Sequence, residues 1–517
     1  MTTPAELQHQ PLAEISNGRC VARSAIPALP LAEFQNAILD AVRDHQRVLA
    51  LFGTPDPADN SPSLTLYVVL ADDRHGRLHV ARTNVPFDGF PSLTPRCPQV
   101  HLFEREIAEQ FGVRPLGHPW LKPVRFHRSY RPGNDAWNRS AKDAVQAGIM
   151  DFYQISGGQV HEVGVGPIHA GIIEPGHFRF QCDGETILHL EISLGYQHRG
   201  VEKAMQGGPN TRCLHYAETL AGDTTISHAT AYVRILESLG QGLISPRSAT
   251  IRAIAMELER LANHVGDLGA LSGDVGFLPT ASFCGRIRGD FLNMTAALCG
   301  NRFGRGLLRI GGVGFDIQPA LADDLLQRLD TAGRECRSAI NLLWETSSVM
   351  ARFEGTGIVS MQSAIELGLV GPAARACGLD MDARRDHPSG IYQFSHIPVS
   401  TWRGGDVFAR AYVRWLEIQR SIQFIQDQLK ALPDGELQTG VAPPQPNSLT
   451  VTTQEAWRGE LCHVALTDTQ GRFEHYKIID PSFHNWMAVA MAVRGKQISD
   501  FPLCNKSFSL SYCGHDL

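Results

Sequence analysis

Residues 218–239 read ETLAGDTTISHATAYVRILESL, and this stretch opens the series of helices that decides the fold class. Asn210 or Thr211 is expected to cap the helix that carries it. The next helix starts behind Pro246, a residue that suits the first helical turn. Its apolar stripe consists of Ile251, Ile254, Ala255, Leu258, Leu261, Ala262 and Val265. Three more long amphipathic segments follow, at 273–301, 321–353 and 407–432. Such helices bury their apolar faces against one another, which predicts a helical bundle.

Length and composition limit the class of protein. The chain has 517 residues, 43% hydrophobic and 19% charged, with a net charge of −6, so we expect two or three globular domains and no nucleic-acid partner. It contains no run of about 18 apolar residues, so no transmembrane helix is expected. The start, MTTPAELQHQPLAEI, lacks the features of a signal peptide, and a cytoplasmic location is predicted.

The domain order is read from these patterns. Residues 1–30 are expected to form a flexible lead-in, 31–130 an α+β domain, 131–150 a linker and 151–517 the second domain. In the first domain, one amphipathic helix precedes strands in RVLALFG, LTLYVVLADD and RLHVARTNV. In the second, strands are expected near 178–181, 187–195, 461–468 and 475–481. The predicted fold is therefore an α+β N-terminal domain followed by a mainly α-helical bundle domain with small flanking β-sheets.

The eleven cysteines are not spaced like metal ligands. None forms a C-x-x-C pair, and buried free thiols are the expected state of a long cytosolic chain. No cysteine-ligated metal cluster held by this chain is predicted.

The end of the first domain contains Glu104-Arg105-Glu106, then Phe111-Gly112 and Gly117-His118-Pro119. This pattern resembles the small quinone-arm subunit of respiratory complex I, although Gln110 stands where that family has an acidic residue. The alternative is a solvated charged helix that ends at Gly112.

The second domain carries a longer ordered series of motifs. They are Gly166-Pro167-Ile168-His169, His198-Arg199-Gly200-Val201-Glu202-Lys203, Glu257-Leu258-Glu259-Arg260, Asn263-His264, Asp274-Val275-Gly276, Gly311-Gly312-Val313, Gly371-Pro372, Arg384-Arg385-Asp386 and Gly405-Asp406-Val407. The series resembles the quinone-pocket subunit of complex I and equally the large subunit of membrane-bound nickel–iron hydrogenases of the hydrogenase 4 and formate hydrogenlyase type. The resemblance covers roughly residues 95–517, and the fusion of both domains is similar to formate hydrogenlyase large subunits.

The resemblance also identifies the metal positions of those hydrogenases, where four thiolates hold nickel and iron. Here they match Ala221, Thr224, Ser482 and Asn485, which we name the four replaced positions. Alanine has no donor, and the other three offer weak neutral oxygens, so no metal site is expected. Four surrounding residues are instead expected to form a hydrogen-bonded polar plug. These are Glu218, Asp223, Asp480 and His484.

For the complex I relatives, the resemblance implies a quinone site beside an iron–sulfur cluster of a partner subunit. Its catalytic proton donors match His169, or His177 in a longer loop, and Asp274. The family tyrosine falls on Leu220, with Tyr216 one turn earlier. The alternatives are satisfied loop histidines and an Asp274 that caps the next helix.

His198, Arg199 and Glu202 are expected near the partner's cluster and the pocket. The alternative is a set of charge pairs on a solvated turn that also includes Lys203.

Together these readings predict the large subunit of the cytosolic arm of a membrane-bound oxidoreductase, without nickel–iron chemistry. No cofactor is expected on this chain, and quinone is the one candidate ligand. The expected partners are an iron–sulfur small subunit and membrane ion-translocating subunits, with a formate dehydrogenase as one candidate reducing module. Attachment to the cytoplasmic membrane is expected through these partners. The alternatives are a quinone-reducing subunit, a non-catalytic scaffold and an ordinary hydrogenase, against which the missing cysteines argue.

Overall fold

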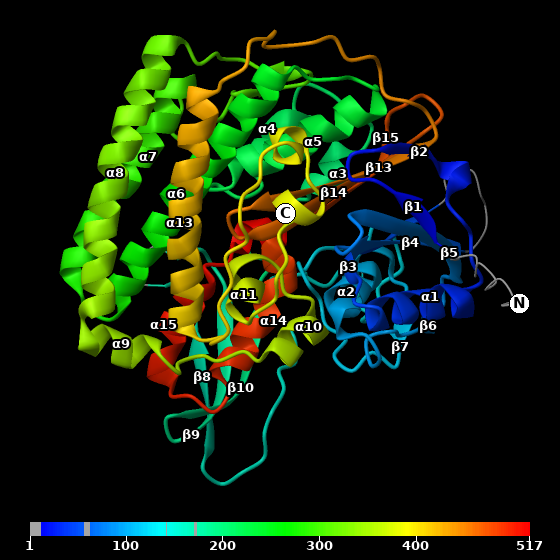
Figure 1. Ribbon diagram of the computed structural model, residues 1–517. Helices are drawn as coiled ribbons and strands as arrows, with labels where there is room; N and C mark the ends of the chain where they lie inside the picture. Colours follow the sequence, from blue (N-terminus) through cyan, green and yellow to red (C-terminus); the bar gives the residue numbers. More distant parts are fainter. Residues whose placement is uncertain (1–11, 56–62, 141, 170–172) are drawn as a thin grey trace, which may run out of the picture.

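The computed structural model places a bundle of long helices beside an N-terminal α+β domain (Figure 1). It describes residues 12–55, 63–140, 142–169 and 173–517. This arrangement is the predicted fold class, with small separate sheets that flank the bundle. None of the helices in the described ranges combines the length and apolarity needed to cross a bilayer.

The N-terminal domain is built on an antiparallel sheet of strand order β1-β5-β4-β3. Its strands are β1 (Ala13–Ile15), β3 (Arg47–Pro55), β4 (Ser63–Asp72) and β5 (Arg77–Pro86). The helices are α1 (Leu31–Arg43) and α2 (His101–Phe111), with the short pair β6 (Phe90–Pro91) and β7 (Pro115–Leu116). Gly112 ends α2 with φ 69°, where a Cβ would lie 2.9 Å from the Asn134 backbone, so glycine is needed there.

Two more sheets belong to the second domain. One has the order β10-β9-β8, and the other β15-β14-β13-β2. Their strands are β8 (Val160–Val165), β9 (His177–Asp183), β10 (Thr186–Ser193), β13 (Ser448–Ala456), β14 (Gly459–Thr467) and β15 (Phe473–Ile479). A two-stranded hairpin joins β11 (Leu308–Arg309) to β12 (Gly312–Val313). Strands β9, β10, β14 and β15 lie where the sequence predicts them, whereas β8 and β13 were not predicted.

Residues 13–22 are not the loosely ordered lead-in that the sequence predicts. Strand β1 pairs with β5 of the first domain, and strand β2 (Cys20–Ala22) pairs with β13 of the second. The first described residues therefore fasten both domains together. The β13–β15 sheet also packs into the core of the N-terminal domain, where Phe52 stacks on His475 with ring centroids 5.0 Å apart.

Four long helices form the bundle, seen side by side on the left of Figure 1. They are α6 (Pro246–Asp274), α7 (Leu278–Cys299), α8 (Pro319–Glu345) and α13 (Val407–Lys430). The Ser245 hydroxyl accepts from the Ser248 amide and caps α6, and the Asp406 carboxylate accepts from the Ala409 amide and caps α13. The apolar stripe of α6 is buried, as its periodicity predicts.

Shorter helices close the remaining faces. They are α3 (Val201–Met205), α4 (Cys213–Glu218), α5 (Thr225–Leu239), α9 (Ser347–Phe353), α10 (Met361–Leu367), α11 (Gly371–Ala376), α12 (Ala383–Asp386), α14 (Pro481–Val493), α15 (Phe501–Phe508) and α16 (Tyr512–Asp516). Single 3₁₀ turns lie at Arg23–Ala25, Pro98–Val100, Gly390–Gln393 and Ile498–Asp500. Residues 131–150, the predicted linker, contain no helix or strand in their described part.

The sequence predicts a single helix that carries residues 218–239. The structure instead has two helices in this region, α4 and α5, with a turn between them. Helix α4 ends at Glu218, α5 begins at Thr225, and neither Asn210 nor Thr211 is a cap. A carboxylate from α6 takes over this role, because Glu259 accepts from the amides of Ile226 and Ser227 at 2.7 and 3.3 Å.

Candidate functional site

The four replaced positions lie on two helix starts that face each other. Ala221 and Thr224 belong to the turn before α5, and Ser482 and Asn485 to the first turns of α14. His228 of α5 and Asp480, the N-cap of α14, join the two starts by a 3.1 Å hydrogen bond. All four positions are buried.

Three of the four replaced positions are held by hydrogen bonds to other parts of the protein. The Thr224 hydroxyl accepts from the Trp457 indole and from Arg458, each at 3.1 Å. The Ser482 hydroxyl accepts from the Ser511 amide at 2.8 Å. The Asn485 amide both accepts from and donates to the Val370 backbone, at 3.0 and 3.1 Å. Their oxygens are thus engaged in holding the fold.

Two carboxylates lie around these positions, each with a cationic or imidazole partner. Asp223 receives two hydrogen bonds from Arg458, at 2.6 and 2.8 Å. Burial alone would raise the pKa of Asp223, but the Arg458 guanidinium lowers it below its usual value. Burial likewise opposes ionisation of Asp480, whereas the bond with His228 lowers its pKa.

A buried chain of polar groups leads inward from Asp480. His228 bonds to His463 at 3.0 Å, and His463 bonds to the Tyr476 hydroxyl at 2.9 Å. Burial lowers the pKa of His463 well below its usual value, so this imidazole is neutral near pH 7. The chain forms a continuous line of hydrogen bonds from Asp480 to Tyr476. His463 and Tyr476 were not predicted from the sequence because neither lies in a motif.

The predicted polar plug is assembled only in part. Asp223 and Asp480 lie at the four replaced positions, as described above. Glu218 instead accepts from the Gly306 amide at 2.6 Å, and His484 packs edge-on against Phe103 of α2 with ring centroids 5.8 Å apart.

The last residues of the chain cover this site. A Cβ at Gly514 would lie 2.7 Å from the Asp480 carboxylate, so only glycine fits there without a shift. Burial raises the pKa of Cys513, in the same segment, to about 12, and its thiol is protonated at neutral pH.

Three motif residues, His198, Arg199 and Glu202, make hydrogen bonds or ion pairs with other residues of this chain. His198 bonds to the Asp516 carbonyl at 2.7 Å, and Arg199 donates to the carbonyls of Thr219 and Leu220 at 2.8 and 3.0 Å. Glu202 is buried and pairs with Lys477 at 2.9 Å. The alternative of a charge pair on a solvated turn is therefore wrong for Glu202.

The three predicted proton donors occupy two places. His169 and the first residue of β9, His177, lie close together: His169 bonds to the carbonyl of Gly176 at 3.0 Å, and His177 bonds to the carbonyl of Gly166 at 3.2 Å. Asp274 is exposed at the last residue of α6, and the start of α7 has no side-chain cap. The alternative role of Asp274 as a cap is thus wrong. Leu220, at the family tyrosine position, is fully buried.

A buried ionic network lies between α6, α11, α12, α13 and β13. Glu417 bonds to Arg375 at 2.7 Å, to His264 at 2.8 Å and to Arg260 at 3.4 Å. Arg384 pairs with Glu257 at 3.2 Å. Several motif residues of the sequence thus stabilise the centre of the bundle. Glu417 was missed because its partners are distant in the sequence.

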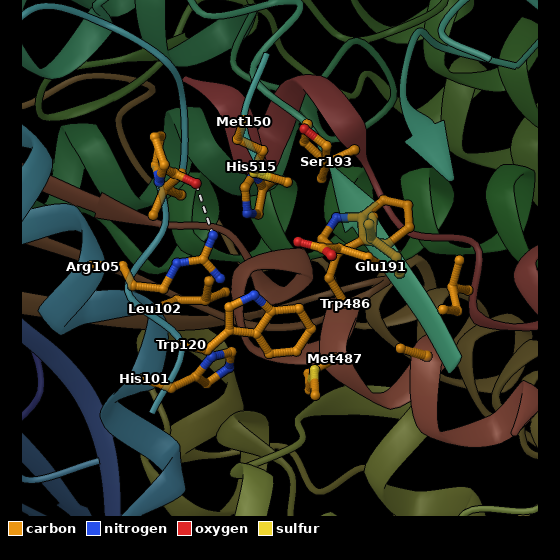
Figure 2. Close-up of a pocket in the computed structure, with 16 residues that line it drawn as sticks. His101, Leu102, Arg105, Trp120, Met150, Glu191, Ser193, Trp486, Met487 and His515 are labelled. Carbon is orange, nitrogen blue, oxygen red and sulfur yellow. Dashed lines mark hydrogen bonds between the residues drawn. The ribbon is translucent and has the colours of Figure 1, made fainter. Parts of the chain in front are cut away.

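A small cavity of about 60 Å³ lies where α2, β10 and α14 meet (Figure 2). Arg105 donates to the Pro123 carbonyl there at 2.7 Å, beside Trp120 and Trp486. The volume suits buried water and is far below the roughly 300 Å³ of ligand pockets.

Four histidines near this cavity, which we name the interface histidines, are expected to make the domain contact acid-sensitive. They are His101, His118, His484 and His515. Burial lowers the pKa of both His101 and His484 to about 3. The unfolded chain binds protons below pH ~6.5 while the folded chain does not, so stability falls with falling pH.

We expect His484→Gln to reduce the stability loss between pH 6.5 and pH 4 by about 3 kcal/mol. Urea unfolding at several pH values measures this slope. The His215→Gln variant, in which a histidine with an exposed side chain is replaced, is measured in parallel as the comparison. An unchanged slope in His484→Gln would contradict the prediction.

Two family models match this chain, one in each half. A model of the "Respiratory-chain NADH dehydrogenase, 30 Kd subunit" matches residues 32–134, and one of the "49 Kd subunit" matches residues 274–448.

Three relatives each match well over half of this chain. The carbon monoxide-induced hydrogenase of Rhodospirillum rubrum is 32% identical over 66% of this chain and 95% of its own length. Formate hydrogenlyase subunit 5 of Escherichia coli is 30% identical over 82% of this chain and 76% of its own. NADH-quinone oxidoreductase subunit 4 of Thermus thermophilus is 28% identical over 66% and 90%. The chain therefore belongs to the family that includes these subunits of hydrogenase, formate hydrogenlyase and NADH-quinone oxidoreductase, with a 30 Kd-type domain fused before a 49 Kd-type domain.

Proposed function

We propose that this chain is the large subunit of the cytosolic arm of a membrane-bound oxidoreductase and has lost the nickel–iron centre. It couples electron transfer from an iron–sulfur partner subunit to a membrane module, by transmitting redox-driven movement or protons. The observation that carries the proposal is the donor set at the four replaced positions, which includes no thiolate.

The residues present do not fit a nickel–iron centre. Nickel and iron in such sites require anionic soft ligands, whereas Ala221 has no donor atom. The oxygens of Thr224, Ser482 and Asn485 already bond to protein groups, and Cys513 contributes one protonated thiol. No group of three or more histidine, cysteine or acidic side chains in the described part of the chain is arranged to hold a metal ion.

The partner and the membrane location rest on the family. The relatives include a formate hydrogenlyase and an NADH-quinone oxidoreductase, and a formate dehydrogenase is one reducing module that would suit the first. Exposed apolar side chains support burial by a partner near the predicted quinone residues. Ile168, beside His169, is 92% exposed, and Leu278, shortly after Asp274, is 66% exposed.

The first test is elemental analysis of the purified complex, with nickel and iron counted per copy of this chain. We expect no nickel, and iron sufficient only for the clusters of the partner subunits. A nickel–iron hydrogenase purified in parallel shows that the preparation retains metal. Nickel near one per chain would refute the proposal.

A quinone-reducing subunit is the second candidate, because His169 and His177 are partly exposed and lie close together, and Asp274 is at an exposed helix end. In this case Asp274→Asn or His169→Ala abolishes quinone turnover by the assembled complex. In a non-catalytic scaffold the same substitutions leave turnover unchanged, and only loss of the whole chain disassembles the complex. The control is Asp330→Asn, which replaces an exposed aspartate away from the predicted quinone residues and should leave quinone turnover unchanged.

A further inference from the structure

A second, larger cavity lies at the opposite end of helix α6 from Asp274. It has a volume of about 430 Å³, within the range of small-molecule pockets. Its walls are the first turns of α6, the middle of α5, the turn at Gly18 and residues 389–394. The lining residue Ala253 and Asp274 are separated by roughly 30 Å along α6. The cavity is therefore distinct from the predicted quinone residues.

Arg234 of α5 lines this cavity and has unused donors. Its Nη1 donates to the Thr453 carbonyl at 3.0 Å and to the Gln454 side-chain oxygen at 3.3 Å, and its Nη2 donates to the Asn17 side-chain oxygen at 3.1 Å. Its Nε has no acceptor, and no carboxylate lies within 4.0 Å, among the residues that the structure describes. The nearby Glu237 is already paired with Arg252 at 2.6 Å.

Arg410 is a buried arginine of this chain in which every side-chain nitrogen donates a hydrogen bond, and it serves for comparison. It also lacks a carboxylate partner in the described ranges, but each of its three nitrogens donates a hydrogen bond, to Ser507, Gly405 and Gly357. The Nε of Arg234 makes no such bond among the described residues. Burial lowers the pKa of Arg234 to about 10 and that of Arg410 to about 10 as well, so the two arginines differ in this free donor and not in their pKa.

Two further features mark the cavity as a binding site. Thr230, one turn before Arg234 on α5, lines the cavity and is 3% exposed, and its hydroxyl has no partner among the described residues. An unpaired buried hydroxyl is costly unless something else bonds to it. Gly18 has φ 73°, and a Cβ there would lie 2.9 Å from Nη2 of Arg234, so the glycine leaves space beside the guanidinium.

Much of the remaining lining is apolar, although Asn17, Ser238, Ser389, Gln393, Gln454 and the Glu237–Arg252 pair also line the cavity. Met256 and Ala253 of α6 form the inner wall with Tyr392, whose hydroxyl is already bonded to Glu257. Phe394 and Leu243 also line the cavity and are both 85% exposed, so they stand at its mouth. This combination suits a ligand with one charged end and an apolar body.

We propose that the cavity binds a small organic anion, with a carboxylate or phosphate group on Arg234 and Thr230 and a ring-sized apolar body between Met256, Tyr392 and Phe394. Arginine binds both kinds of oxyanion through paired N–H donors, and the threonine hydroxyl supplies a further donor. The site needs no partner subunit and does not depend on the proposed function.

Calorimetric titration of the full chain tests the site with three probes of similar shape. They are benzoate, phenyl phosphate and the neutral benzamide. We expect at least one of the two anions to bind at least tenfold more tightly than benzamide, and which of them does so distinguishes a carboxylate from a phosphate ligand. Equal affinity for all three probes, or no binding of either anion, overturns the proposal.

Two variants locate the binding. Arg234→Gln should weaken anion binding by about 10- to 100-fold, because it removes hydrogen bonds to a charged group. Thr230→Val removes the unpartnered hydroxyl without changing the shape, so it should not lower the melting temperature of the ligand-free protein and should weaken the binding by about fivefold. Arg334→Gln, an exposed arginine on α8, is the matched control and should bind as the wild type does.

Unchanged affinity in Arg234→Gln refutes the proposal. If that variant does not fold, Thr230→Val decides alone, and wild-type affinity in it refutes the proposal equally.

Discussion

Glu417→Gln is expected to lower the free energy of unfolding by about 3–5 kcal/mol, because it removes one partner from a buried ionic network. Burial opposes the charge of Glu417, yet Arg375 and His264 hold its pKa well below the usual value. The substitution keeps the side-chain volume and deletes the charge. The amide keeps one acceptor oxygen and places an NH2 donor at the other position, so either Arg375 or the pair His264 and Arg260 loses its hydrogen bonds to residue 417. Arg375 retains Glu455 at 2.7 Å.

Urea unfolding followed by circular dichroism measures this loss. The control is Glu335→Gln, whose ion pair with Arg286 is exposed on α8, and it should cost less than about 1 kcal/mol. Equal effects in the two variants would show that the buried network does not carry the stability assigned to it.

Lys477→Met, at the contact between the two domains, is expected to lower the free energy of unfolding by a similar amount, about 3–5 kcal/mol. The Lys477 ammonium lies 2.6 Å from both oxygens of Glu106 on α2 and 2.9 Å from Glu202 on α3. Arg125 is the second cation on Glu106. The two cations balance the two carboxylates, and the substitution leaves one buried negative charge in excess.

The charge count makes a second, sharper prediction. Adding Glu202→Gln to Lys477→Met restores neutrality, so the double variant should be more stable than Lys477→Met alone. Unfolding of the two single variants, the double variant and the wild type forms a double-mutant cycle, with an expected coupling of about 1–3 kcal/mol. Lys430→Met on the exposed end of α13 is the control. A double variant that is no more stable than Lys477→Met would contradict the assignment.

Apolar periodicity, with the proline at the start of α6, was enough to predict the fold class and most of the long helices, whereas the predicted caps Asn210 and Thr211 were wrong. The stripe of α6 and the proline at its start are local signals, and they are seen in the structure. The break before α5 was not predictable in this way, because the carboxylate that receives its first amides is Glu259, on another helix. Strands β1 and β2 were missed because each has three residues and pairs with a distant strand.

For the candidate site, the sequence indicated which donors are missing but not what replaces them. Arg458 and Val370, which hold Thr224 and Asn485, belong to no motif and approach only through the tertiary fold. The ionic network shows the converse. The Glu257–Arg260 pair is visible as a spacing of three residues, whereas Glu417 and Arg375 join it across the bundle. The roles of His169, His177 and Asp274 stay predictions.

The pairing of β2 with β13 has a consequence for how the protein is made on the ribosome. Ala22 is synthesised about 426 residues before its partner Ser448. At about 5–20 residues per second, roughly 20 to 85 s pass between the synthesis of β2 and that of its partner strand β13. During this interval the nascent chain exposes an open strand edge that can pair with a neighbouring polypeptide. We therefore expect slower elongation, or a chaperone that shields the nascent N-terminal segment, to affect the yield of folded protein more than changes within the helical bundle.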